Sequence, residues 1–286
     1  MLIHIERNLQ RRAFHIAKFY DWLRVNEMTP IQIKIKVLYT CMFMAYLYGA
    51  ETWWRIDDVS DRLCTLERKF LRSVLHAKHS VPDEILYLEI GRPDIIATTK
   101  QRQYSFFRRL MSLSEDEAVC RRIVSLHRNL PMLQYYDDIK SDVAAKNKEQ
   151  KLSSLTSSVS TYHSRYRDLV DLNLNHVIYE SCLPEALRIV ITRWRLSNHK
   201  LRIESDRYTR PKVHRSMRVC KRCGVVEDES HAIYDCPIFA SVRDRFQSLL
   251  QRYPTIRQVL NPTNVQDATT LGNFLLEIEK KIDQKN

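Results

Sequence analysis

The chain of 286 residues contains few of the residues that make tight turns, with only four glycines and nine prolines. Sandwiches and barrels join many short strands through such turns, so this composition argues against both. Leu, Arg, Lys and Glu are plentiful instead, and these residues favour helices. We therefore expect a mainly α fold, with enough chain for one or two domains and a sizeable core.

The sequence also lacks the marks of secreted and membrane proteins. The cysteines number seven, an odd count, and four of them stand singly in helix-like stretches: Cys41, Cys64, Cys120 and Cys182. No disulfide framework is expected. Residues 1–12 have no apolar core followed by a small-residue cleavage site, which argues against a secretory signal. The longest apolar run, 37–50, is shorter than the roughly twenty residues that cross a bilayer. We expect an intracellular protein, nuclear or cytoplasmic, without a membrane partner.

Changes in pattern along the chain indicate three regions. In residues 1–140 apolar side chains recur at helical spacing, which predicts a helical block. In 141–172 the pattern fades into Lys, Glu, Gln and Ser, which is typical of a linker. Pro184 then begins a helix with Trp194 on its apolar face, and another helix is expected over about 271–282. The third region, 173–286, is predicted to hold a basic helix and a small zinc-binding module.

The net charge of +12 is concentrated in one part of the chain. Residues 188–222 contain twelve Lys or Arg against Glu204 and Asp206, a local charge of +10. Such a field attracts polyanions because their condensed counterions are released on binding. Nucleic acid is the first candidate partner and an anionic membrane surface the second, while an ordinary solvated face is the alternative.

We take most of this stretch as the candidate nucleic-acid-binding surface. Dispersed cations are expected to contact phosphates and to carry little base information. Tyr208 is the better candidate for stacking on a base, because Trp194 lies on an apolar helix face and is expected in the core. The candidate residues are Arg193, Arg195, Lys200, Arg202, Arg207, Tyr208, Arg210, Lys212, Arg215, Arg218, Lys221 and Arg222.

A second pattern, C-x2-C-x7-H-x4-C, places four metal-ligating side chains in a short segment: Cys220, Cys223, His231 and Cys236. Three thiolates and one imidazole suit tetrahedral Zn²⁺ and exclude cations that prefer oxygen. Four protein ligands leave no position for water, so one structural zinc ion is predicted. The alternatives are unrelated free cysteines or a redox pair, and a redox pair leaves His231 and Cys236 unexplained.

Together these segments resemble the C-terminal region of non-LTR (LINE-type) retrotransposon reverse transcriptases. Residues 195–201 and 203–237, which include the Glu227 to His231 run, are similar to the CCHC zinc-knuckle region of those proteins. Residues 47–53, 66–72 and 89–93 resemble the segment that follows the polymerase palm. The resemblance covers most of the chain in two blocks, leaving the linker and the extreme tail.

The resemblance implies a parent RNA-directed DNA polymerase, of which this region would bind RNA or DNA. Residues 1–140 would pack against the palm like a thumb. In this chain they would expose an apolar face, and self-association through these helices would follow.

No catalytic site is expected in this chain. The run Tyr135-Tyr136-Asp137-Asp138 has the form of a polymerase palm motif, but Pro131 precedes it where an apolar strand is needed. Asp94 with Glu279 and Lys281 can be fitted to a nuclease pattern only across widely separated segments. A cryptic metal-dependent nuclease and a protein-interaction module remain the alternatives to a non-catalytic nucleic-acid-binding protein.

Overall fold

A computed structural model describes residues 13–50, 60–114, 119, 121–122, 142–171 and 177–284. Apart from one isolated bridge between Val219 and Val226, the regular structure in these ranges is helical, as expected. The helices of the N-terminal half are α2 (Ala13–Val25), α3 (Ile31–Val37), the π-helix η1 (Leu38–Phe43), α4 (Met44–Tyr46), α5 (Ser60–Leu75), α6 (Asp83–Ile90), α7 (Ile95–Ser112) and α10 (Val143–Ser157).

The C-terminal half consists of shorter helices around one long one. They are α11 (Thr161–Leu169), α12 (Val177–Glu180), α13 (Glu185–Arg195), α14 (Arg202–Ser205), η4 (Arg215–Met217), η5 (His231–Asp235), η6 (Pro237–Phe239), α15 (Ala240–Arg245), α16 (Gln247–Arg252), α17 (Ile256–Val259) and α18 (Val265–Asp283). The predicted helices after Pro184 and near the C-terminus correspond to α13 and α18.

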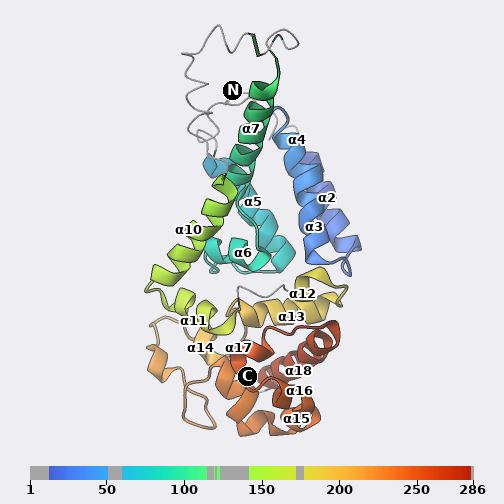
Figure 1. Ribbon diagram of the computed structural model, residues 1–286. Coiled ribbons are helices and arrows are strands. Elements are labelled where there is room, and N and C mark those ends of the chain that lie inside the picture. Colours follow the sequence, from blue (N-terminus) through green and yellow to red (C-terminus); the bar gives the residue numbers. More distant parts are fainter. Residues whose placement is uncertain are drawn as a thin grey trace.

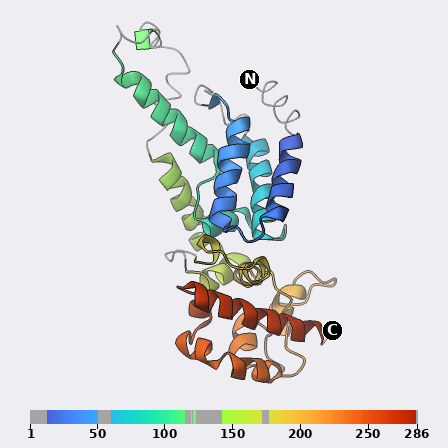
Figure 2. The ribbon, with the colours of Figure 1, turned by 90° about the vertical axis from the view of Figure 1, so that its right-hand side faces the viewer.

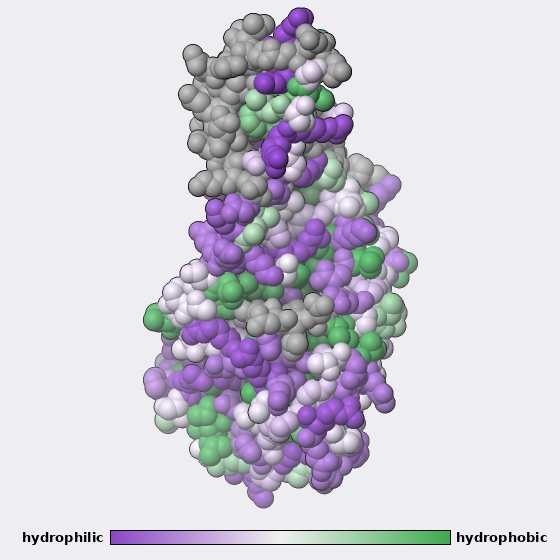
Figure 3. Space-filling model, viewed as in Figure 1, coloured by the Kyte–Doolittle hydropathy of each residue, from purple (hydrophilic) through white to green (hydrophobic). Residues whose placement is uncertain are grey.

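The two halves are stacked along the long axis of the molecule (Figure 1). α2 to α7 and α10 form the N-terminal half, and α11 to α13 lie between them and the remaining helices. Figure 2, turned by 90°, shows the same stacking, with α7 reaching furthest from the C-terminal half. Hydrophilic side chains predominate on the face seen in Figure 3, and apolar ones form scattered groups.

The segment 141–172, expected to be a linker, instead contains α10 and α11. α10 packs on α6 and α7, with Leu155 fully buried. Its polar residues also have partners: Lys151 and Asn147 donate to Asp94 at 2.7 and 2.8 Å. The polar composition wrongly indicated a linker, because one buried apolar residue and a few hydrogen-bonded polar residues are enough to pack α10 against the fold.

α13 and α18 pack closely in the C-terminal half. Gly272 of α18 makes this possible, because a Cβ added there would lie 2.7 Å from the Cβ of Leu187. Trp194 is fully buried in the same region and donates from Nε1 to Glu279 at 3.3 Å. Its predicted place in the core is confirmed.

One apolar core runs through both halves, from Phe19 in α2 to Ile282 in α18. It includes Cys220 and Cys236, so the cysteine-rich segment packs on the helices rather than standing apart from them. Within the described ranges, no helix has the length and apolar character needed to cross a bilayer.

Candidate metal centre and basic surface

The first two candidate metal ligands lie on a tight turn. The isolated bridge between Val219 and Val226 brings the two arms of the turn together, and the Cys220 N–H donates to the Val225 carbonyl at 2.7 Å. Gly224 has a φ of 71°, a conformation that glycine adopts without steric cost. The turn therefore places the Cys220 and Cys223 thiols on the same side of the turn, where both can contact one metal ion.

The other two ligands come from a single π-helical turn, η5. His231 and Cys236 are five residues apart, a separation that would rotate them by about 140° on an α-helix. In η5 the Cys236 N–H donates to the His231 carbonyl at 2.7 Å, an i to i+5 bond that brings both side chains to the same face. Asp228 holds the start of this turn by accepting from the His231 N–H at 3.0 Å.

The four side chains converge. Their ligand atoms all lie within 4.8 Å of one another, and the Sγ of Cys236 is 3.9 Å from the Sγ atoms of both Cys220 and Cys223. Tetrahedral zinc with Zn–S bonds of about 2.3 Å requires S···S separations of about 3.8 Å. The Nε2 atom of His231 is buried without a hydrogen-bond partner among the described residues, which fits a metal ligand. The cluster can hold one metal ion.

Burial and the repulsion between neighbouring thiolates shift the pKa values of the cysteine thiols. Burial raises the pKa of Cys236 to about 12, and the neighbouring Cys220 thiolate adds to this. Burial also opposes ionisation of Cys220, but hydrogen bonds from the backbone N–H groups of Arg222 and Cys223 outweigh it and lower the pKa of Cys220. Two thiolates this close are stabilised together only by a cation between them.

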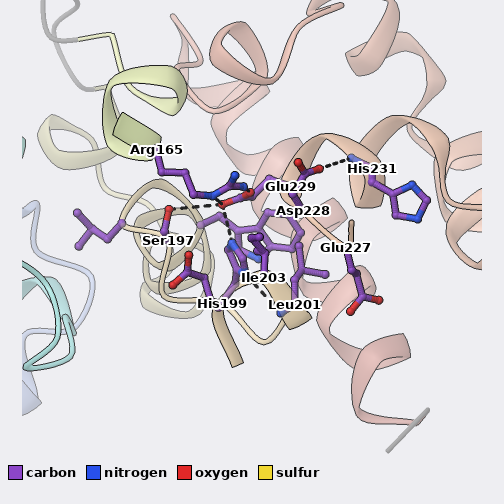
Figure 4. Close-up of polar contacts among 12 residues, drawn as sticks. Arg165, Ser197, His199, Leu201, Ile203, Glu227, Asp228, Glu229 and His231 are labelled. Atoms are coloured by element: carbon purple, nitrogen blue, oxygen red, sulfur yellow. Dashed lines mark hydrogen bonds and ion pairs between the residues drawn. The ribbon is translucent and has the colours of Figure 1, made fainter. Parts of the chain in front are cut away.

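A buried carboxylate supports the segment that carries His231. Glu229 forms an ion pair with Arg165 of α11 and lies 2.8 Å from Nε2 of His199. The Leu201 N–H donates to Nδ1 of His199, and burial together with the charge of Arg165 lowers the pKa of His199 well below its usual value. Figure 4 shows Glu229 directed at these partners and the His231 ring directed away from them. Glu229 therefore orients this segment and leaves His231 for the cysteines.

Arg195, expected on the nucleic-acid-binding surface, is instead fully buried. Its Nε atom donates to Glu89 at 2.6 Å, and its Nη1 atom donates to the Leu260 carbonyl and the Asn261 side chain. A guanidinium enclosed in this way cannot reach a phosphate. The prediction for Arg195 is wrong, because the acid that pairs with it lies more than a hundred positions away in sequence.

Five other candidate cations lie at the surface but have partners within the chain. Arg193 pairs with Glu279, Lys200 with Asp283, Arg202 with Asp206 and Arg207 with Glu204, at 2.7, 2.6, 2.8 and 3.0 Å. Arg218 donates to the carbonyl groups of Val213 and Ile203. The four ion pairs neutralise part of the local charge of the stretch, whereas the carbonyl contacts only hold the Arg218 side chain in place.

The remaining candidates are exposed. Tyr208 is 58 % exposed. Five cations are exposed as well, and their side chains form no hydrogen bond or ion pair with any described residue: Arg210, Lys212, Arg215, Lys221 and Arg222. Arg210, Lys212 and Arg215 occupy the segment between α14 and the turn at Cys220, where Arg215 begins η4, whereas Lys221 and Arg222 lie on that turn. Lys221 and Arg222 therefore place exposed positive charge on the turn that carries two of the candidate metal ligands.

The residues that resemble catalytic motifs have structural contacts where they are described. Asp94 caps α7 by accepting from the Ala97 N–H at 2.9 Å and pairs with Lys151. Glu279 accepts from Arg193 and Trp194. The run 135–138 lies outside the described residues.

Comparison with protein-family models, with curated proteins and with solved structures returned no match.

The supporting carboxylates Glu89 and Glu229 were not singled out from the sequence for these roles. A fully buried glutamate has no local signature, and only the arginine opposite it in the fold explains its place.

Proposed function

We propose that this chain is a zinc-stabilised nucleic-acid-binding protein without a catalytic site of its own. The observation that carries the proposal is that exposed cations lie on the turn with two of the metal ligands and in the segment that leads into it. Lys221 and Arg222 lie between two of the metal ligands in sequence, and the loop with Arg210, Lys212 and Arg215 leads into the same turn. A metal ion that fixes this turn also fixes cations that phosphates can reach.

The cluster suits zinc best among the common metals, since three thiolates and one imidazole favour a soft or borderline cation with tetrahedral geometry. With four protein ligands, the ion supplies folding energy and activates no water. The similarity to LINE-type reverse transcriptases supports the same function, with the chain as the part that binds RNA or DNA and the polymerase palm elsewhere in the parent protein.

Binding of labelled single-stranded and duplex oligonucleotides over a range of salt concentrations tests this proposal. Affinity should fall steeply as salt rises, because phosphate neutralisation releases counterions. Chelation of the metal should weaken binding, since the turn with Lys221 and Arg222 loses its fixed shape. Affinity that is absent at low salt in zinc-loaded protein would reject the proposal.

A further inference from the structure

A cleft of about 780 Å³ lies beside the metal site. Its walls come from the turn between α5 and α6, with Lys78 and Ser80; from the segment 197–208; from the turn of the metal cluster, with Lys221 and Arg222, and Glu227 beyond it; and from η6 and α18, with Ile238 and Ile282. The α5–α6 turn lies at the end of the N-terminal half that faces the C-terminal half (Figure 1). The cleft is therefore built jointly by both halves.

Positively charged side chains outnumber negatively charged ones in the walls of the cleft. Lys78, Lys221 and Arg222 are exposed, and none of them forms a hydrogen bond or ion pair through its side chain with any residue that the structure describes. The walls also contain three acids, each with a partner: Asp206 pairs with Arg202, Glu204 pairs with Arg207, and Glu227 accepts from the Arg202 N–H at 3.0 Å. The charge of Lys78 also reaches the interior, where it contributes, after burial and Arg165, to lowering the pKa of His199.

The uncharged part of the lining suits a flat aromatic group. Ile238 and Ile282 contribute apolar surface, and Tyr208, which is 58 % exposed, lies on the wall. A volume of this size falls in the range of about 300 to 1,000 Å³ found for sites that enclose small ligands. An unpaired nucleotide fits such a site, whereas a duplex keeps its bases stacked and paired inside.

We propose that this cleft binds a single-stranded segment of nucleic acid, with phosphates on Lys78, Lys221 and Arg222 and a base against Tyr208. The proposal rests on the nucleic-acid-binding function proposed above and adds the path of the strand. It also adds Lys78, which belongs to the helical N-terminal half and lies far in sequence from the basic stretch. The metal ion then has a second consequence, because it holds one wall of the cleft in place.

The test of the phosphate contacts compares two lysines of the same region in the full-length, zinc-loaded protein. Lys78→Ala removes a cation of the cleft, and Lys69→Ala removes an exposed cation of α5 outside it. Fluorescence anisotropy with a labelled oligothymidylate should show that Lys78→Ala lowers affinity about fivefold at 0.1 M salt and flattens the salt slope by about 0.7. Lys69→Ala should leave both unchanged. An RNA oligonucleotide of the corresponding sequence, measured in parallel, shows which backbone the cleft prefers.

A further comparison tests the base contact. Wild type and Tyr208→Phe should bind the oligothymidylate between about fivefold and about a hundredfold more tightly than an abasic strand of the same length, because stacking requires the base. Tyr208→Ala should lose this preference. Equal affinity of the wild type for both strands would overturn the base contact.

The outcomes separate the two proposals. If the wild type binds neither oligonucleotide, the proposed function itself fails. If the wild type binds and Arg210→Ala with Lys212→Ala and Arg215→Ala weakens it, but Lys78→Ala behaves like Lys69→Ala, the function stands and the cleft is rejected. If polyglutamate competes as well as the oligothymidylate, the cleft recognises only negative charge and the proposal of a nucleic-acid strand is overturned.

Discussion

Arg195 of α13 and Glu89 of α6 form an ion pair in which neither side chain has any exposed surface, with Nε 2.6 Å from Oε1. Tyr166 and Tyr179 donate to the same carboxylate. The pair therefore joins the N-terminal half to α11, α12 and α13 through one enclosed charge network.

Removing one partner of this pair should destabilise the protein strongly. Arg195→Met leaves the Glu89 carboxylate buried without its cation, which should cost about 3 to 5 kcal/mol of unfolding free energy. Urea denaturation monitored by circular dichroism measures this loss. Arg195→Met combined with Glu89→Leu should cost less than the sum of the single changes, since neither charge is then left alone. Wild-type stability in the single variant would contradict a structural role for the pair.

The metal site should bind one zinc ion per chain. Native mass spectrometry of protein prepared with zinc should show one ion, and Cys223→Ser should lower the occupancy because it removes a ligand. Cys182→Ser is the matched control, since Cys182 is an exposed free thiol outside the cluster. Chelation should unfold the segment around η5 while α2 to α7 stay helical. Equal metal content in the two serine variants would refute the assignment.

The loop of exposed cations should contribute affinity without sequence preference. If roughly four to six phosphates are neutralised on a single strand, log affinity should fall with log salt at a slope of about −3 to −4. Replacing Arg210, Lys212 and Arg215 together by alanine should flatten the slope by about 2, at roughly 0.7 per contact. Titrations with several unrelated oligonucleotides should show a similar loss for each. A loss confined to one sequence would instead indicate base-specific recognition.

Stability should depend on pH through Glu67. Burial raises the pKa of this carboxyl to about 7, although Tyr39, Tyr87 and the Ile95 N–H donate to it. Between about pH 4.5 and 7 the unfolded chain loses this proton while the folded chain keeps it, so stability falls as pH rises through this window, by about 3 kcal/mol. Chemical denaturation at several pH values measures this, and the difference between wild type and Glu67→Gln isolates it. A difference that does not change with pH would contradict the raised pKa.

The chain should show neither primer extension nor DNA nicking above background with Mg²⁺ or Mn²⁺. Asp94 and Glu279 both hold structural contacts, and the group of side chains placed to hold a metal ion among the described residues is the cysteine and histidine cluster, which contains no carboxylate pair for metal-dependent catalysis. Gel assays with labelled primer and template test this. Activity that disappears in Asp137→Ala would show that the run 135–138 is catalytic.

Helical content and the place of Trp194 were predictable because both depend on local pattern. An apolar stripe at helical spacing buries the same side whatever packs against it. The segment 141–172 was wrongly expected to be a linker because its apolar positions are few. α10 docks through Leu155 and through polar contacts to Asp94, and a composition rich in Lys and Ser does not reveal such partners.

The sequence by itself determined the four candidate metal ligands, because their identity and short spacing are local and a turn or one helical turn can bring them together. Tertiary structure decided which cations remain accessible. Arg195 is enclosed by Glu89 of α6, whereas Lys78 of the α5–α6 turn reaches the cleft beside the metal cluster. Arg195 is neutralised because the fold places Glu89 beside it, 106 positions away along the chain, whereas Lys78 has no ion-pair partner among the described residues and its charge stays exposed.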